Sequence, residues 1–215
     1  MSRRAILIRS GLLAAAVSSA CSSTPTSQDT ARQTQAVLQS SFRAQGIATL
    51  ERLNQDELQQ ACSGESPPPA DVAKRLEAAQ RAAIQWPADG LYLGDWKRGE
   101  ALAQSGRGMT WNDAPGVPSG GNCYNCHQLA PAEISYGTLG PSLLGYGRLR
   151  GVANPTDPVA APVVEYTWGK LWNAKAYNAC SGMPRFGHAG VLTPAQIRDL
   201  MALLLDPQSP VNRLP

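Results

Sequence analysis

Cys123, Cys126 and His127 are residues whose types and spacing point to a defined chemistry. Two cysteines three positions apart lie on the same side of a helical turn. Their sulfurs can therefore add to the two vinyl groups along one edge of a haem. A histidine directly after the second cysteine can then bind the iron from one face. The pattern Cys-x-x-Cys-His thus predicts one covalently attached haem c.

Two other interpretations of the same cysteines have to be weighed. Cys-x-x-Cys is also the motif of redox dithiols, but those lie beside a strand–helix–strand unit, and nothing here resembles one. A zinc site would need further ligands, and none of the available side chains has a second paired spacing. Those side chains are Cys62, Cys180 and His188, besides His127. The sequence therefore favours haem over zinc or a dithiol.

The second axial ligand of the iron has several candidates, namely Met109, Met183, Met201, His188 and a lysine. Met183 precedes a proline, which biases its backbone toward an extended form and projects its side chain from a loop. Met201 lies on the apolar side of a predicted helix, where a core role is expected. We favour Met183, with His188 or an open iron site as the alternatives.

Cys62 and Cys180 are predicted to form a disulfide. Haem attachment uses two of the five cysteines, and N-terminal processing accounts for Cys21. A free thiol in an oxidising compartment would risk unwanted oxidation, so the two remaining cysteines should pair. The bond would tie the region around Cys62 to the loop that carries Met183.

Residues 1–21 are typical of an export signal. Arg3 and Arg4 form a basic start, an apolar stretch follows, and small residues precede Cys21. The apolar stretch is too short to span a bilayer. We expect a periplasmic protein, and the sequence leaves open whether Cys21 carries a lipid anchor.

Composition excludes some classes of partner. The formal net charge is +3, but three of the 19 basic residues lie in the export signal. Their removal leaves 16 basic against 16 acidic residues, so the mature chain is close to neutral. Such a chain has no electrostatic footprint for nucleic acid.

Helical periodicity and capping residues predict an all-α fold. Helices are expected over residues 30–44, 54–62, 71–87, 95–104 and 193–205, with loops over 112–121 and 137–165. Gly99, inside a helix, suggests close approach of another helix. We expect an export signal over 1–21, a linker and helical extension over 22–91, and a haem domain over 92–215. This layout resembles a class I cytochrome c. The likeness implies that the last helix crosses at Gly99, through Leu200, Met201 or Leu204, and that the Pro141 carbonyl accepts the His127 imidazole N–H.

Four stretches narrow the resemblance. They are residues 121–128, 140–147, 178–187 and 203–212, including Met183-Pro184-Arg185-Phe186-Gly187. Together they are similar to the SoxX family, the monohaem subunits of the SoxXA cytochromes of bacterial sulfur oxidation. The likeness extends over about residues 50 to 215.

The SoxX resemblance implies partners and a reaction. It implies a heterodimer with a SoxA-like haem subunit that carries the catalytic centre of an L-cysteine S-thiosulfotransferase. That enzyme joins thiosulfate to a reactive cysteine on a carrier protein. This chain would then accept electrons and pass them to a soluble cytochrome, without a catalytic residue of its own. Tyr124, Tyr146 and Trp172 are candidates for an apolar contact with the partner, and the alternative for each is packing against the chain's own haem. The alternatives are a freestanding periplasmic electron carrier and a haem sensor.

Overall fold

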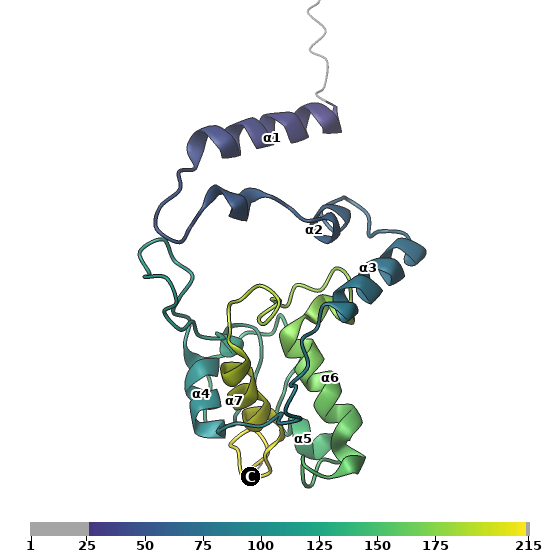
Figure 1. Cartoon of the computed structure of the whole chain (residues 1–215), viewed down its shortest axis with the longest axis vertical. Coiled ribbons are helices and arrows are strands. Elements are labelled where there is room, and N and C mark those ends of the chain that lie inside the picture. Colours follow the sequence, from purple (N-terminus) through teal and green to yellow (C-terminus); the bar gives the residue numbers. More distant parts are fainter. Residues whose placement is uncertain (1–25, 214–215) are drawn as a thin grey trace, which may run out of the picture. The chain divides into compact units, whose positions relative to one another are not determined.

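The computed structural model describes residues 26–213 and is built from helices and loops (Figure 1). No strand forms in that range, where the only extended pairing is an isolated bridge between Gln45 and Ala48. The prediction of an all-α fold is therefore confirmed, while the cytochrome c-like topology stays a prediction. The expected export signal and Cys21 lie outside the described residues.

The α-helices are α1 Ser27–Ser41, α2 Glu57–Ala61, α3 Ala70–Ala82, α4 Trp96–Gln104, α5 Tyr146–Leu149, α6 Ala161–Trp172 and α7 Pro194–Leu205. Short 3-10 turns lie at η1 Leu50–Leu53, η2 Cys123–Asn125, η3 Pro158–Ala160 and η4 Ala174–Ala176. The chain divides into two compact units, one ending at Phe42 and one beginning at Arg43. Across residues 26–213, no helix is both long and apolar enough to cross a membrane.

Helix α1 belongs to the first unit and has no buried residue. It begins at Ser27 rather than near residue 30, because Thr26 caps it. The Thr26 side chain accepts a hydrogen bond from the Asp29 amide, and the Asp29 carboxylate accepts one from the Thr26 amide. This reciprocal pair satisfies two backbone donors that a bare helix start would leave unpaired.

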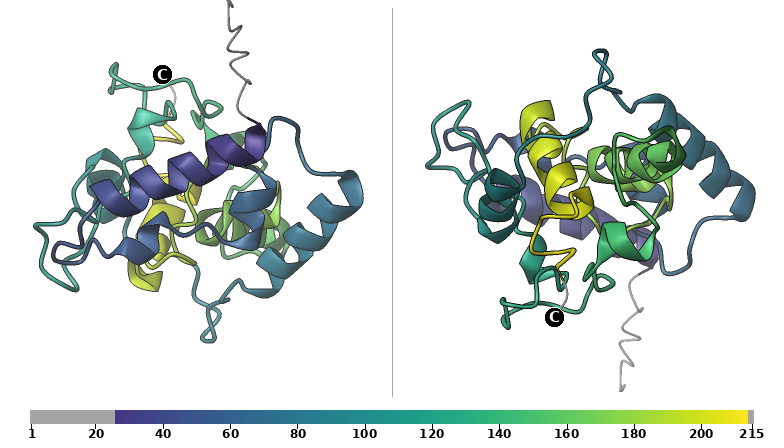
Figure 2. Two further views of the ribbon diagram at one scale, coloured as in Figure 1. Left: turned by 90° about the horizontal axis from the view of Figure 1, so that it is seen from above. Right: turned by 90° about the horizontal axis from the view of Figure 1, so that it is seen from below.

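Helices α4 and α7 make the most extensive helix–helix contact of the second unit, and Figure 2 shows them side by side in both views. Gly99 lies at the crossing, where an added Cβ would stand 2.2 Å from the Asp199 carbonyl oxygen and 3.0 Å from Leu203 Cβ. The crossing was predicted, but its contact residues lie slightly off the expected Leu200, Met201 and Leu204. Asp199 also binds the other helix through Arg98, with Nη2–Oδ1 at 2.8 Å.

Helices α2 and α3 form the extension before the predicted haem domain. The cap of α2 is Asp56 with Gln59, two residues beyond the expected Asn54 with Glu57. Helix α3 ends at Ala82, one turn before the expected stop at Pro87. Leu58 and Leu76 from these helices are each 2 % exposed and pack with Ala179 in a small second core.

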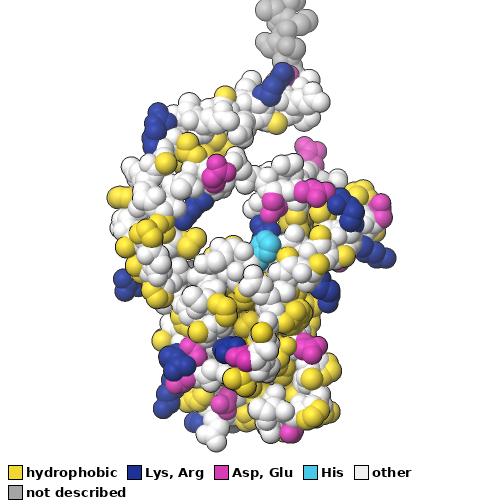
Figure 3. Space-filling model, viewed as in Figure 1, with side chains coloured by type: hydrophobic (Ala, Val, Ile, Leu, Met, Phe, Trp, Pro, Cys, Tyr) yellow, Lys and Arg dark blue, Asp and Glu magenta, His cyan; other side chains and the backbone are white. Residues whose placement is uncertain are grey.

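Helix α6 lies partly inside the segment 137–165 that was predicted to be a loop, and α5 and η3 lie wholly inside it, so that prediction was wrong for residues 146–149 and 158–165. Pro162 sits in its first turn, where the missing N–H costs nothing. The helix buries Val164, Trp168 and Leu171 against α7 and the main core. On the side of the molecule drawn in Figure 3, acidic and basic side chains are interspersed among apolar ones.

Candidate functional site

Cys123, Cys126 and His127 lie on a single tight turn. Asn122 enters it with a left-handed backbone, at φ 50°, and η2 follows. The Cys126 and His127 amides both donate to the Cys123 carbonyl, at 3.1 and 2.9 Å. Both cysteines are free thiols and partly buried. The turn therefore presents two unpaired sulfurs with a histidine directly after them.

The His127 ring is oriented by a backbone carbonyl. Its Nδ1 lies 2.7 Å from the Pro141 oxygen, which can only accept a hydrogen bond. Nδ1 must therefore carry the proton, and the Nε2 lone pair is left free for a metal. This is the acceptor that the resemblance to class I cytochromes c implies.

The segment 137–143 holds the turn from one side. The amides of Gly137, Gly140 and Leu143 donate to the carbonyls of Tyr124, Cys126 and Gln128, at 2.8, 2.8 and 2.7 Å. A Cβ on Gly140 would stand 2.2 Å from His127 Cε1. Glycine is therefore required there for the backbone to lie against the imidazole.

Helix α4 holds the turn from the other side. The Gly121 amide donates to the Leu102 carbonyl at 2.8 Å, and the Asn122 amide to that of Ser105 at 2.9 Å. The Tyr124 hydroxyl donates to Glu100 Oε1 at 2.8 Å. The turn is thus fixed to the helix that crosses α7.

The Cys123 thiol does not have the character of a reactive thiol. Burial raises the pKa of the Cys123 thiol to about 12, so the sulfur stays protonated at neutral pH. Redox dithiols depend on a thiolate, which a lowered pKa provides. Among residues 26–213, no three side chains of His, Cys, Asp or Glu are grouped to hold a metal ion.

Met183 is partly buried and packs against the main core, which Cys123 also borders. Its amide donates to Ser181 Oγ at 3.2 Å. No hydrogen bond within the described range joins this loop directly to the Cys-x-x-Cys-His turn. The shared core is therefore the structural link between the two.

The other candidates for the second axial position are less well placed. Met201 is fully buried on α7, in the core role expected for it. Met109 is 39 % exposed, with a left-handed backbone at φ 62°. His188 is exposed as a residue, but its ring is partly desolvated. This desolvation is the larger cause of its lowered pKa, and the Arg185 charge is the second. Met183 therefore stays the preferred candidate.

Comparison with known proteins gives a relative in a bacterium. No family model matches the chain. An uncharacterized lipoprotein of Aquifex aeolicus (strain VF5) is 39 % identical over 163 residues, which cover 74 % of this chain and 73 % of the relative. The chain belongs to the same family as that lipoprotein. The aligned length is too great for the likeness to rest on the Cys-x-x-Cys-His motif alone.

Three aromatic residues that the sequence suggested for a partner contact are buried instead. Tyr124, Tyr146 and Trp172 are 6, 5 and 3 % exposed. The Tyr124 hydroxyl pairs with Glu100, and that of Tyr146 lies 2.9 Å from Thr167 Oγ1. They are core residues, because each ring packs between helices and loops that are far apart in the sequence. Those contacts could not be predicted from the sequence.

Trp172 has a feature that could not be predicted from the residue types. Its indole packs against Gly187, where an added Cβ would stand 2.4 Å from Trp172 Cδ2. Its Nε1 is buried and finds no hydrogen-bond partner in the described part of the chain. Trp168, one turn earlier, donates its Nε1 to the Gln85 carbonyl at 2.9 Å. A buried N–H without an acceptor is uncommon and suits a ligand that supplies one.

Proposed function

We propose that this chain is a monohaem c-type cytochrome, with haem attached at Cys123 and Cys126 and axial ligands from His127 and Met183. The observation that carries the proposal is the Cys-x-x-Cys-His turn, with its imidazole already set by the Pro141 carbonyl at 2.7 Å. Two unpaired sulfurs and an oriented Nε2 on one turn meet the requirements of thioether attachment and axial ligation.

Two further observations support the fit to haem. The backbone at Gly140 lies against the imidazole, where an added Cβ would stand 2.2 Å from Cε1 and 2.7 Å from Nε2, so a glycine there keeps space beside the ring. The unpaired Trp172 Nε1 would suit a carboxylate, and haem carries two such groups on an otherwise apolar ring. A buried donor of this kind gains most from a charged acceptor.

The residues of this chain hold, orient and shield the cofactor. Haem, when bound, supplies a one-electron couple. His127 would bind the iron through the Nε2 lone pair, the Pro141 carbonyl would raise the basicity of its ring, and Met183 would supply the second ligand. Ligation by His and Met raises the reduction potential, which suits a protein that accepts electrons.

The proposed role is the electron-transfer subunit of a thiosulfate-oxidising complex. It rests on the SoxX resemblance, and the catalytic centre would lie on a larger haem-bearing partner. The relative from Aquifex is a lipoprotein. Together with the small residues before Cys21, this supports export and a lipid anchor at that cysteine.

The test is purification of the chain after expression with haem-maturation proteins. We expect one haem per chain that resists extraction by acid–acetone, and loss of attachment in a Cys123→Ala, Cys126→Ala variant. The ferric spectrum should show the weak far-red band of Met ligation, which Met183→Ala should abolish. Haem-free protein from the maturing host would contradict the cytochrome assignment.

The role in sulfur oxidation needs a separate assay. Affinity purification from thiosulfate-grown cells should recover a second haem protein. Thiosulfate-dependent modification of the carrier cysteine should then require both chains. Turnover by this chain alone would overturn the subunit role, and recovery without any haem partner would favour a freestanding carrier.

A further inference from the structure

The loop that carries Met183 is tied to the helical extension on its N-terminal side. Cys180 forms a disulfide with Cys62, which directly follows α2. Ala179 is 2 % exposed and packs between Leu58 of α2 and Leu76 of α3. Its amide donates to Glu77 Oε1 at 2.9 Å. Covalent, apolar and polar contacts thus meet three to four residues before Met183.

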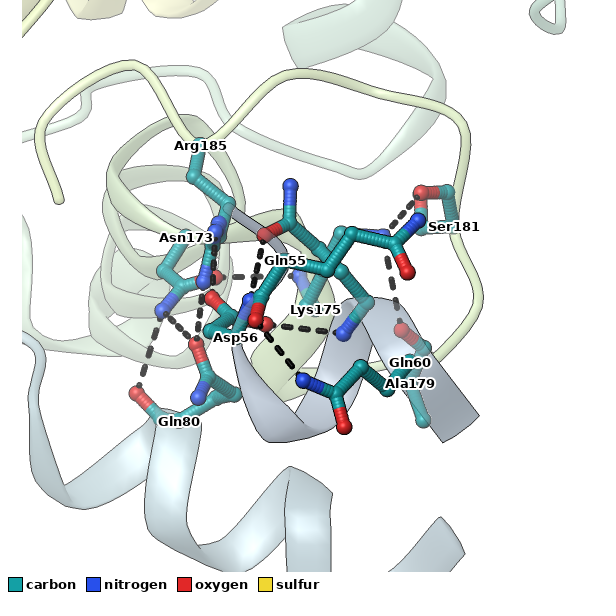
Figure 4. A network of polar contacts seen from close by, with 10 residues as sticks. Gln55, Asp56, Gln60, Gln80, Asn173, Lys175, Ala179, Ser181 and Arg185 are labelled. Atoms are coloured by element: carbon teal, nitrogen blue, oxygen red, sulfur yellow. Dashed lines mark hydrogen bonds and ion pairs between the residues drawn. The ribbon is translucent and has the colours of Figure 1, made fainter. Parts of the chain in front are cut away.

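A second set of contacts holds the C-terminal side of the loop. Arg185 Nη2 lies 2.7 Å from Asp56 Oδ2, and the Arg185 side chain is only 14 % exposed. Figure 4 shows Arg185 and Asp56 within one polar network. Met183 therefore stands between two anchors, Cys180 and Arg185, that both lead to α2.

Helix α3 fixes the segment from which the loop departs. Asn173 is fully buried and donates through Nδ2 to Gln80 Oε1 at 2.9 Å (Figure 4). Arg81 Nη2 donates to the Ala176 carbonyl at 3.0 Å. Lys175 Nζ donates to the Ser181 carbonyl at 2.8 Å, inside the loop itself. These contacts leave the loop little freedom to move independently of the extension.

We propose that α2 and α3 form a brace that positions Met183, so that the second axial ligand depends on the Cys62–Cys180 disulfide and the Asp56–Arg185 ion pair. The proposal rests on the His127 and Met183 ligation proposed above. Asp56, Arg185 and the two cysteines are positioning residues that act through the loop.

The brace makes the axial ligand sensitive to dithiols. Cys180 is exposed, so a thiolate from a dithiol can attack its sulfur and release Cys62. The second thiol of the reagent then closes the reagent's own disulfide and frees Cys180. Two electrons and two protons pass to the protein, which gains two thiols. With one anchor gone, Met183 leaves the iron more often and an external ligand can enter.

The experiment measures imidazole binding to ferric holoprotein. Purified protein is reduced with dithiothreitol, its thiols are alkylated, and the haem is reoxidised with ferricyanide. We expect the far-red band to weaken and the apparent affinity for imidazole to rise about tenfold or more, since that affinity follows the open fraction. Asp56→Asn should shift both readouts in the same direction.

Glu57→Gln provides the matched control. It breaks the Glu57–Arg75 pair, which joins the same two helices at 2.7 Å but does not touch the loop. Its band and imidazole affinity should match the wild type. A wild-type protein without the far-red band would refute the ligation itself. A normal wild-type band that persists after reduction, with unchanged imidazole affinity, would refute the brace alone.

Discussion

His127 shows how two neighbouring groups decide what one side chain can do. The Pro141 carbonyl fixes the proton on Nδ1, at 2.7 Å, and the Gly140 backbone lies flat against the ring. An imidazole held in this way stays in one tautomer and directs its Nε2 to one side. Ligand strength and geometry are therefore set before any metal arrives.

Gly140→Ala is predicted to damage the site and lower stability. The new Cβ would stand 2.2 Å from His127 Cε1, so the ring or the backbone must move. Overpacking of this kind costs about 1–3 kcal/mol. Denaturant unfolding and the yield of attached haem measure both effects. Gly64→Ala, whose Cβ would be 3.6 Å from the Ser66 carbonyl oxygen, should leave both unchanged.

Trp172→Phe is predicted to destabilise the holoprotein more than the haem-free chain. Without haem, Nε1 has no partner to lose, whereas a bond to a carboxylate is worth about 1.5–3 kcal/mol. The measurement is the free energy of unfolding of each form, with Cys123→Ala, Cys126→Ala as the haem-free chain. Trp168→Phe loses a bond to Gln85 in either form, so its cost should be the same in both. Equal costs for Trp172→Phe would refute the pairing.

The crossing of α4 and α7 gives a prediction at the scale of elements. Helix propensity alone would make Gly99→Ala stabilising by about 1 kcal/mol. The crossing reverses that sign, because the Cβ would stand 2.2 Å from the Asp199 carbonyl oxygen. We expect a net loss of about 1–3 kcal/mol in the free energy of unfolding. A raised denaturation midpoint would show that the helices can separate without cost.

The elements that the sequence could predict are those with local signals at their ends. Helix α7 has Thr193 and Gln196 as a capping box, and both hydrogen bonds are present. Helix α6 has no such cap, begins among prolines and is buried along most of its length, so its periodicity is weak. Tertiary packing stabilises this helix, and no local sequence pattern predicts that packing.

The same limit applies to the candidate site. The Cys-x-x-Cys-His spacing and the Cys62–Cys180 disulfide could be inferred from residue types, and that disulfide is present. The Asp56–Arg185 pair could not, because its residues are far apart in the sequence and no local pattern links one to the other. For Trp172 the sequence left a partner contact and packing inside the chain both open, since its burial depends on the loop around Gly187.

At the scale of the whole molecule, the disulfide closes a loop with a sequence separation of 118 residues. In the chain-entropy account, such a cross-link stabilises the fold by about 4–5 kcal/mol, mainly by restricting the unfolded chain. Cys62→Ser with Cys180→Ser should lower the free energy of unfolding by up to that amount in haem-free protein. A loss below about 1 kcal/mol would mean that the polar contacts of α2 and α3 hold the extension without it.

The surface available to a partner differs from the one the sequence suggested. Ile134 and Leu139 are 88 and 85 % exposed on the loop between the Cys-x-x-Cys-His turn and Gly140. Large apolar side chains so close to the proposed haem suit an interface that brings two haems together. Ile134 and Leu139 do not stand out in the sequence, because they lie on no helical face. The sequence signal for an exposed apolar surface was the group Ile134, Tyr136 and Leu139, three large apolar residues in a loop without periodicity.

Ile134→Asp with Leu139→Asp is therefore predicted to weaken the complex with the haem-bearing partner. A buried charge at the centre of an interface should raise Kd by about tenfold or more. The far-red band and the haem yield should stay unchanged, because neither side chain is a proposed ligand. Titration calorimetry with the partner measures Kd, and Val159→Asp, at 83 % exposed on η3, is the control. If both variants bind the partner as tightly as the wild type, the contact lies on another face, since an interface through this loop cannot accept two carboxylates without cost.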